Sequence, residues 1–203
     1  MVIDDRGRYV NGDHLMIIMT RNCFPDGGTV IVTADTSVTI NQFLEPLGFD
    51  IVPCRVGQSF LGSLAREKKA VFAGEPTGHY MFPQYSLHGD GIRGIMVLLQ
   101  AIQKEGVPLS EIVDEFPPTV INRIQLEADV DLTERTDEVA EYLTNRFGTY
   151  RQIHTRLFVG ENDGVKAVFR QSPFDATIRL FTESLDAKES ETLLEEMKKV
   201  IVS

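Results

Sequence analysis

Short apolar runs alternate with amphipathic stretches along the first half of the chain. Residues 29–33, 49–53 and 70–74 have the length and composition of buried strands. The amphipathic stretches between them, residues 35–48 and 57–69, are predicted helices. Because strands that alternate with helices usually pair in parallel, this order predicts an α/β domain, with a parallel or mixed sheet in the middle of three layers.

A longer helix is predicted from about Asp90 to Gly106, with Gly106 and Pro108 as its stop signals. Apolar residues recur along this segment at helical spacing: Ile92, Ile95, Met96, Leu99 and Ile102. Residues at this spacing share one face of a helix. We therefore expect this apolar face to pack on the sheet and to complete the first domain.

The pattern changes at Pro117 and Pro118, which cannot continue a helix. Residues 119–130 then alternate apolar and polar side chains, as a half-buried strand does. Further elements are predicted downstream: a helix over 133–147, strands over 154–159, 165–170 and 177–183, and a last helix with its apolar face at 193–201. Residues 160–164, Gly-Glu-Asn-Asp-Gly, predict a hairpin turn. The second half is thus a predicted α+β domain, a four-stranded antiparallel sheet with two helices.

Charge and cysteine content narrow the classes of partner. The 203 residues carry a net charge of −10, and no Lys/Arg cluster gathers on one predicted face. Nucleic acid and anionic membranes are therefore not expected as partners, whereas a small phosphorylated metabolite fits local basic groups. Cys23 and Cys54 form no CxxC pair, which argues against a disulfide framework or a structural zinc site. Without an apolar run of about 18 residues or a signal peptide, we expect a cytoplasmic location.

The first candidate site follows the predicted strand at 70–74. Glu75 can accept from two neighbouring sugar hydroxyls, and Thr77 can donate or accept a hydrogen bond. His79 can bind a hydroxyl or phosphate, or move a proton. The carboxyl ends of strands in open α/β sheets are common ligand sites, so a polyol is the predicted ligand. The alternative is a polar turn whose side chains only cap neighbouring backbone groups.

The second candidate site contains Arg170, Ser172 and Arg179, around a loop between two predicted strands. Guanidinium groups match phosphate with paired donors, and a serine hydroxyl can complete the site. The sequence therefore predicts phosphate binding here. In the alternative interpretation, both arginines are exposed strand residues on an acidic surface.

The histidines outside residues 75–79 are weaker candidates for a functional site. His88 and Asp90 precede the long predicted helix, where we expect Asp90 to act as the helix cap. His88 is a second candidate for the cleft of His79, but two histidines without a third ligand do not predict a metal site. His14 and His154 are interpreted as incidental.

Five short segments follow one another along the chain: GRYVNGD (7–13), RVG (55–57), GEPTGH (74–79), HGDGI (88–92) and RQS with IR (170–179). In this order they resemble the α-D-phosphohexomutase superfamily, the phosphoglucomutases and phosphomannomutases. The resemblance implies that Glu75, Thr77 and His79 recognise sugar hydroxyls and that Arg170 and Ser172 bind the substrate phosphate. It also implies a proton-transfer role for His79.

The chain departs from this family in two respects. The family's phosphoserine loop and its Asp-rich Mg²⁺ loop are not found in the sequence; Asp4 and Asp5 align beside the latter and are not assigned as ligands. Mg²⁺ is therefore expected only in the complete family enzyme. Pro173 and Phe174 stand where the phosphate loop has Gly and Thr, which removes an N–H donor and a hydroxyl. The altered loop is expected to bind phosphate more weakly, to bind another anion, or to be a relic.

These observations lead to one main hypothesis, the C-terminal portion of a phosphohexomutase. Residues 1–25 would be the remnant of a preceding domain, 26–116 the sugar-recognition domain and 117–203 the phosphate-binding domain. The chain would bind a hexose phosphate, have no activity alone, and be completed by missing N-terminal domains or an N-terminal partner chain. Apolar residues 14–19 would then face those absent domains. The alternatives are a non-catalytic sugar-phosphate-binding or regulatory protein, and an interaction module whose clefts are unused.

Overall fold

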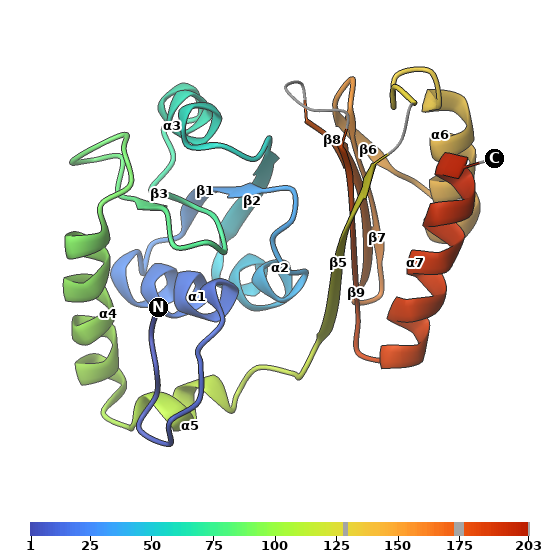
Figure 1. Cartoon of the computed structure of the whole chain (residues 1–203). Coiled ribbons are helices and arrows are strands. Elements are labelled where there is room, and N and C mark those ends of the chain that lie inside the picture. The colour runs from blue at the N-terminus through green and yellow to red at the C-terminus, as the bar shows by residue number, and fades with distance from the viewer. Residues whose placement is uncertain (128–129, 173–176, 203) are drawn as a thin grey trace. The chain divides into compact units, whose positions relative to one another are not determined.

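The computed structural model describes residues 1–127, 130–172 and 177–202. The chain divides into two compact units, Met1–Pro117 and Pro118–Ser203. The division falls between the two prolines, one residue after the boundary predicted from the sequence. Each unit has a hydrophobic core of its own. Figure 1 labels the helices and strands of both units.

A four-stranded sheet forms the centre of the first unit. Its strands are β1 (Gly28–Thr33), β2 (Phe49–Cys54), β3 (Phe72–Gly74) and β4 (Tyr80–Met81). They lie in the order β2-β1-β3-β4. Strand β1 is parallel to β2 and β3, and β4 is antiparallel to β3. The predicted α/β class with a mixed sheet is confirmed.

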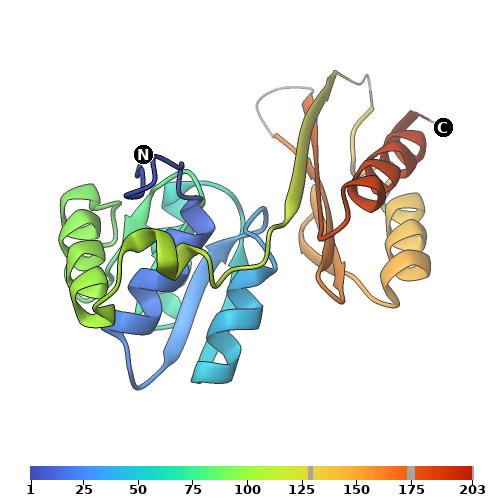
Figure 2. The same cartoon turned by 90° about the horizontal axis from the view of Figure 1, so that it is seen from below.

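Helices cover both faces of this sheet (Figures 1 and 2). They are α1 (Gly12–Cys23), α2 (Thr39–Leu44) with a 3₁₀ turn (Glu45–Leu47), α3 (Gln58–Glu67), α4 (Gly91–Glu105) and α5 (Leu109–Val113). Ile31 and Ala73 belong to a core cluster with Leu61 of α3. Val30 and Phe72 belong to a larger cluster with residues of α1, α2 and α4. Because successive strand residues point to opposite faces, the same short strands serve both layers.

Helix α1 differs most from the predicted architecture. The sequence predicted residues 1–25 as the remnant of another domain, with residues 14–19 exposed. In the structure α1 lies within the first unit, and Leu15 to Met19 are at most 5% exposed. Asn11 caps the helix by accepting from the N–H of Asp13, and helices α2 and α4 pack against it. A short run that is apolar at nearly every position has no polar face from which its helical periodicity can be recognised.

Helix α4 buries a different face from the one that the sequence predicted. The buried residues of α4 are Gly94, Leu98 and Ala101. A Cβ at Gly94 would lie 3.3 Å from a ring carbon of Tyr80, so a glycine lets the helix approach β4 closely. Of the predicted inward face, Ile102 packs on the core. The other four residues are 59–78% exposed: Ile92, Ile95, Met96 and Leu99. Because both faces are apolar, periodicity alone does not indicate which one is buried.

An antiparallel sheet with two helices forms the second unit. Its strands are β5 (Val120–Glu127), β6 (Arg151–His154), β7 (Leu157–Asn162), β8 (Val165–Gln171) and β9 (Thr177–Ser184), in the order β5-β9-β8-β7-β6. Helices α6 (Thr136–Phe147) and α7 (Ala187–Val202) contribute to the same core as β7, β8 and β9. The predicted α+β arrangement is confirmed, with one strand more than the four expected.

The additional strand is β6, at the edge of the sheet. The sequence predicted a single strand from His154, but the chain turns at Thr155 and Arg156, and β6 pairs with β7. A short polar edge strand carries little alternation, so its pattern did not reveal it. The predicted hairpin turn between β7 and β8 is present, with positive φ at Asp163 and Gly164.

The two cysteines, Cys23 and Cys54, are both free. Burial raises the pKa of the Cys54 thiol to about 11 and also raises the pKa of Cys23. Both thiols are therefore protonated and weakly nucleophilic at neutral pH. Within the described ranges, no helix is long and apolar enough to cross a membrane.

His14 makes the stability of the first unit sensitive to acid. Its ring stacks on Phe116 with 4.4 Å between centroids, and burial lowers the pKa of His14 from 6.5 to about 4. Unfolding restores the ordinary pKa, so the unfolded chain binds more protons between these two values. We therefore expect the free energy of unfolding to fall by about 2.5 kcal/mol between pH 7 and pH 4.5 through this residue.

Urea unfolding at both pH values measures this effect. The variant His14→Phe keeps a ring against Phe116 and removes the titrating group, so most of this pH dependence should disappear. His88→Phe is the matched control, because His88 is exposed and its replacement should leave the dependence as in the wild type. The same dependence in His14→Phe and the wild type would contradict the prediction.

Candidate functional site

Three loops leave the first sheet at the same end of its strands. Residues 34–38 follow β1, residues 55–57 follow β2 and residues 75–79 follow β3. These strands are parallel, so all three loops start from carboxyl ends. Open α/β sheets bind ligands at this edge. The loop with the predicted sugar-recognition residues therefore lies where a ligand site is expected.

Glu75 is held in a tight turn between β3 and β4. Its N–H donates to the carbonyl of His79 at 3.2 Å, and the N–H of Gly78 donates to the carbonyl of Glu75 at 3.0 Å. Gly78 has a φ of +99°, a conformation that L side chains rarely adopt. The side chain of Glu75 is only 7% exposed. The turn thus fixes a carboxylate beneath the surface of the loop.

The carboxylate of Glu75 orients the ring of His79. Nδ1 of His79 is hydrogen-bonded to Oε1 of Glu75, and Oγ1 of Thr77 lies 3.3 Å from the same nitrogen. The side chain of His79 is 55% exposed. Because Nδ1 is engaged, Nε2 is the nitrogen that can meet a ligand. One short turn therefore carries a carboxylate, a hydroxyl and an oriented ring nitrogen, groups suited to the hydroxyls of a sugar.

The start of α1 supports this loop, a contact that the sequence analysis missed. A Cβ at Gly12 would lie 2.0 Å from the carbonyl oxygen of Pro76, so the contact depends on the absence of a side chain. The next residue, Asp13, is fully buried, and its Oδ1 accepts from the N–H of Ser37. Helix α1 thereby contacts the loops after both β1 and β3. The only sequence signal was the Gly-Asp pair after the cap Asn11.

A cationic side chain, that of Arg55, lies at the same end of the strands. Arg55 directly follows β2, and its guanidinium carbon lies 4.0 Å from the centroid of the Phe60 ring. Stacking on a ring holds the planar group and leaves its edge donors suited to an anion. The sequence analysis noted this segment for its resemblance but gave Arg55 no role.

The loop before α4 borders His79. A Cβ at Gly89 would lie 3.5 Å from Cδ2 of the His79 ring. Asp90 caps α4, as predicted, because its Oδ1 accepts from the N–H of Arg93 at 2.9 Å. His88 is exposed on this loop. The loop thus reaches the site through the backbone at Gly89.

Arg170 and Arg179 are cross-strand partners in the second unit. Strands β8 and β9 pair antiparallel and place the two arginines directly opposite each other. Side chains in this relation point to the same face of the sheet. Ser172 directly follows β8 and is buried. Pro173 and Phe174, the predicted departures from the phosphate loop, lie outside the described residues.

Asp4 and Asp5, which the resemblance places beside the family's metal loop, take part in contacts within the first unit. Asp4 accepts from backbone N–H groups of Arg6 and Arg8 and from Nε of Arg8. Asp5 accepts from the N–H and the hydroxyl of Ser110. In the described part of the chain, no three His, Cys, Asp or Glu side chains gather as a metal site would require.

Sequence comparison finds relatives along the whole chain. A family model described as "Phosphoglucomutase/phosphomannomutase, alpha/beta/alpha domain III" matches residues 11–120. A "Probable phosphoglucosamine mutase" of Pyrococcus abyssi is 26% identical over 203 residues. That alignment includes 98% of this chain and 45% of the relative.

Solved structures share the fold. A phosphoglucomutase/phosphomannomutase family protein of Burkholderia thailandensis matches with a TM-score of 0.80 at 17% identity, over 98% of this chain and 43% of that one. N-acetylphosphoglucosamine mutase of Aspergillus fumigatus matches with a TM-score of 0.69 at 15% identity, over 98% and 45%. This chain thus spans less than half the length of these proteins and corresponds to their C-terminal half. Since the family model matches more than half of its residues, the chain belongs to the phosphoglucomutase/phosphomannomutase family.

Proposed function

We propose that this chain binds a hexose phosphate and presents the sugar for phosphoryl transfer. The observation that carries the proposal is the turn in which the buried carboxylate of Glu75 holds the half-exposed ring of His79. The remaining lone pairs of that carboxylate accept from sugar hydroxyls, and the hydroxyl of Thr77 donates or accepts. Nε2 of His79 binds a further hydroxyl or carries a proton to or from it.

The relatives suggest which sugar to test first. The Pyrococcus abyssi relative is named a probable phosphoglucosamine mutase, and the Aspergillus fumigatus structure is described as a complex with GlcNAc-6P and magnesium. We therefore take glucosamine 6-phosphate as the first ligand. Glucose and mannose phosphates are the alternatives, because Glu75, Thr77 and His79 can serve sugars that differ at one position.

We assign phosphate binding in the second unit to Arg170, Ser172 and Arg179. The facing register of the two arginines supports this assignment, since it places both guanidinium groups on one face of the sheet. Two guanidinium groups offer paired N–H donors to phosphate oxygens. The hydroxyl of Ser172 would add a donor at the end of β8.

We place the groups that transfer the phosphoryl outside residues 1–203. In the family as a whole, a phosphoserine donates the phosphoryl and Mg²⁺ neutralises the developing charge. Asp4 and Asp5 do not fit that metal, because they are bonded to arginine and serine donors. The chain on its own would hold and orient the sugar without turnover. The remaining groups would come from further domains or from a partner chain.

Isothermal titration of the 203-residue chain tests the proposal. We expect glucosamine 6-phosphate to bind at least about tenfold more tightly than glucosamine or inorganic phosphate. The reason is that glucosamine 6-phosphate offers both sugar hydroxyls, which inorganic phosphate lacks, and an anion, which glucosamine lacks. Equal affinity for glucosamine 6-phosphate and inorganic phosphate would contradict sugar recognition.

A variant in the second unit locates the phosphate. Arg170→Ala should weaken binding of inorganic phosphate and leave binding of glucosamine unchanged. Arg146→Ala is the matched control, because Arg146 lies on α6 and donates to Glu189. If both variants bind as the wild type does, the assignment of phosphate to the second unit is wrong.

A further inference from the structure

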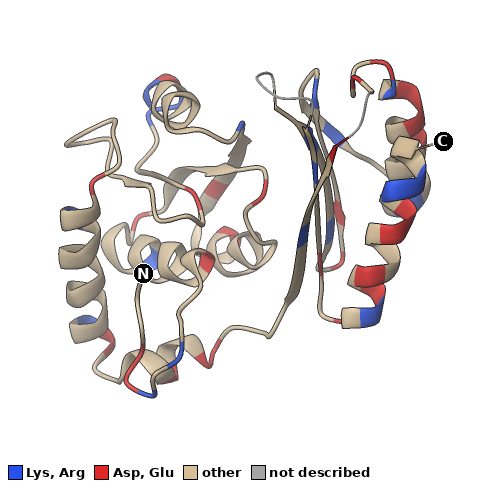
Figure 3. Cartoon of the chain, viewed as in Figure 1, with Lys and Arg blue, Asp and Glu red and all other residues tan. Residues whose placement is uncertain are grey.

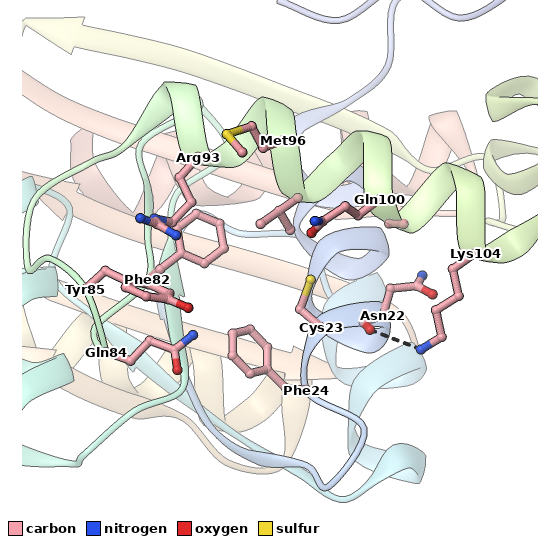
Figure 4. Close-up of a pocket in the computed structure, with 12 residues that line it drawn as sticks. Asn22, Cys23, Phe24, Phe82, Gln84, Tyr85, Arg93, Met96, Gln100 and Lys104 are labelled. Atoms are coloured by element: carbon pink, nitrogen blue, oxygen red, sulfur yellow. Dashed lines mark hydrogen bonds between the residues drawn. The ribbon is translucent and has the colours of Figure 1, made fainter.

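A pocket of about 390 Å³ lies beside α4 within the first unit, and we call it the α4 pocket (Figure 4). Its twelve lining residues come from the end of α1 and the residue after it, from the loop after β4, and from α4. None of these twelve belongs to the turn of residues 75–79. Small-molecule sites usually have volumes of roughly 300–1,000 Å³. The α4 pocket is therefore large enough for a ligand of its own, separate from the proposed sugar site.

Apolar side chains form the middle of the α4 pocket. Phe24, Phe82, Met96 and Ala101 are among them (Figure 4). Phe82 and Ala101 are at most 2% exposed, and Phe82 packs edge-on against Phe72 with 5.4 Å between ring centroids. This wall is thus part of the rigid core of the unit. A flat ring buries much apolar area against aromatic walls at a small cost in conformational entropy. The middle of the pocket is therefore suited to a ring.

Arg93 supplies a cation at one end of the α4 pocket. Its Cζ lies 3.7 Å from the centroid of the Tyr85 ring, and its side chain is 37% exposed (Figure 4). Nε is buried and lies 3.4 Å from Oδ2 of Asp90, so Nη1 and Nη2 are the nitrogens that a ligand can reach. Stacking on a ring fixes the plane of the guanidinium. Arg93 is therefore oriented to offer paired N–H donors to an anionic group.

The charge balance of the α4 pocket also favours an anion. Lys104 lies toward the opposite end, where its Nζ donates to the carbonyl of Asn22 at 3.1 Å (Figure 4). The twelve lining residues include these two cations and no carboxylate, although the chain has a net charge of −10. Within α4 itself the one acidic residue is Glu105, at its last position (Figure 3). Glu105 accepts from the side chains of Arg21 and Asn22. A positively charged pocket on an acidic protein selects for negatively charged ligands.

We propose that the α4 pocket binds a small aromatic anion, a flat apolar ring that carries a carboxylate or a phosphate group. The ring packs between Phe24, Phe82 and Met96, and the anionic group accepts from Nη1 and Nη2 of Arg93. The side-chain amides of Gln84 and Gln100 also line the pocket and can bond to polar substituents of the ring. The inference goes beyond the proposed function and does not depend on it.

Methyl NMR of the 203-residue chain tests the proposal, because Met96 lines the pocket. The ¹³C-labelled methyl group of Met96 reports binding, and Met197, buried in the second unit, is the internal control. The probes are naphthyl phosphate and naphthoate, with naphthol and inorganic phosphate as the separate parts. We expect at least one aromatic anion to shift the Met96 signal and to bind at least about tenfold more tightly than either part. The anion that binds identifies phosphate or carboxylate as the group recognised.

Three results would overturn the proposal: no shift of the Met96 signal, equal shifts of Met96 and Met197, or equal affinity for naphthol and both aromatic anions. The first would mean that the pocket is not a ligand site for these compounds. The second would mean that the aromatic anions bind without selectivity for the pocket. The third would mean that the ring alone binds and that the cation has no part in recognition.

A variant of Arg93 tests the role of the cation. Arg93→Gln should weaken binding of the aromatic anion at least about tenfold and leave binding of naphthol unchanged, because it removes a charged donor from the pocket. Arg66→Gln is the matched control, since Arg66 is an exposed arginine of the same unit on α3. Unchanged signals of the buried methionines would show that Arg93→Gln is folded. Wild-type affinity in that folded variant would refute the site as proposed.

Discussion

Replacing Glu75 by glutamine is expected to weaken binding of glucosamine 6-phosphate by about 1.5–3 kcal/mol, roughly 10- to 150-fold. Glutamine keeps the size of the side chain and an oxygen that can accept from His79. It removes the negative charge that makes the carboxylate a strong acceptor for sugar hydroxyls. Because the side chain is 7% exposed, the lost hydrogen bonds are poorly replaced by water.

The affinity loss should come without loss of stability. Glutamine keeps an oxygen that accepts from Nδ1 of His79, whose ring is half-exposed, so the melting temperature of Glu75→Gln should stay close to that of the wild type. Glu67→Gln is the control, since Glu67 is exposed at the end of α3 and distant from the loop in sequence. Wild-type affinity in Glu75→Gln would mean that its carboxylate only orients the turn.

Replacing Gly12 by alanine is expected to destabilise the first unit and to disturb the sugar loop at the same time. The new Cβ would lie 2.0 Å from the carbonyl oxygen of Pro76 and 3.0 Å from its Cα. A backbone obstacle cannot rotate away as a side chain can, so either α1 or the loop must move. Adding a methyl group to a packed contact costs about 1–3 kcal/mol, and we expect the upper end of this range.

Urea unfolding and titration with glucosamine 6-phosphate measure the two effects of Gly12→Ala. The matched control is Gly91→Ala, at the first position of α4, where a Cβ would meet no atom within 4 Å. Alanine should leave the unit unchanged there or stabilise it by about 0.4–1 kcal/mol. If Gly12→Ala keeps both stability and affinity, the contact between α1 and the loop does not support the site.

The parts of the fold that could be predicted from sequence are those whose pattern fits only one kind of element. Strands β1, β2 and β3 are short apolar runs between helices, and β5 alternates along its length, so all four were found. Helix α1 has no clear polar side, and α4 is apolar on two sides, so pattern alone could place neither correctly. Strand β4 has only two residues, too few to form a pattern.

Some features of the candidate site could likewise be predicted from sequence, and others could not. Glu75, Thr77 and His79 could be proposed from sequence because a single turn places them together, and no pairing between distant segments is needed. The contact of Gly12 with Pro76 joins segments far apart in the chain, so it depends on the packed fold. The facing of Arg170 and Arg179 depends on the register of β8 and β9, which residue types do not specify.

The turn that holds Glu75 also affects the rate and the affinity with which a ligand would bind. Its backbone hydrogen bonds, from Glu75 to His79 and from Gly78 to Glu75, join residues of the turn itself, so closing them needs no contact with a ligand. Ordering a mobile loop costs about 1–2 kcal/mol per residue in conformational entropy. A preorganised turn avoids most of that cost, so more of the contact energy remains as affinity. Association at this loop would then be limited by encounter with the ligand rather than by closure of the loop.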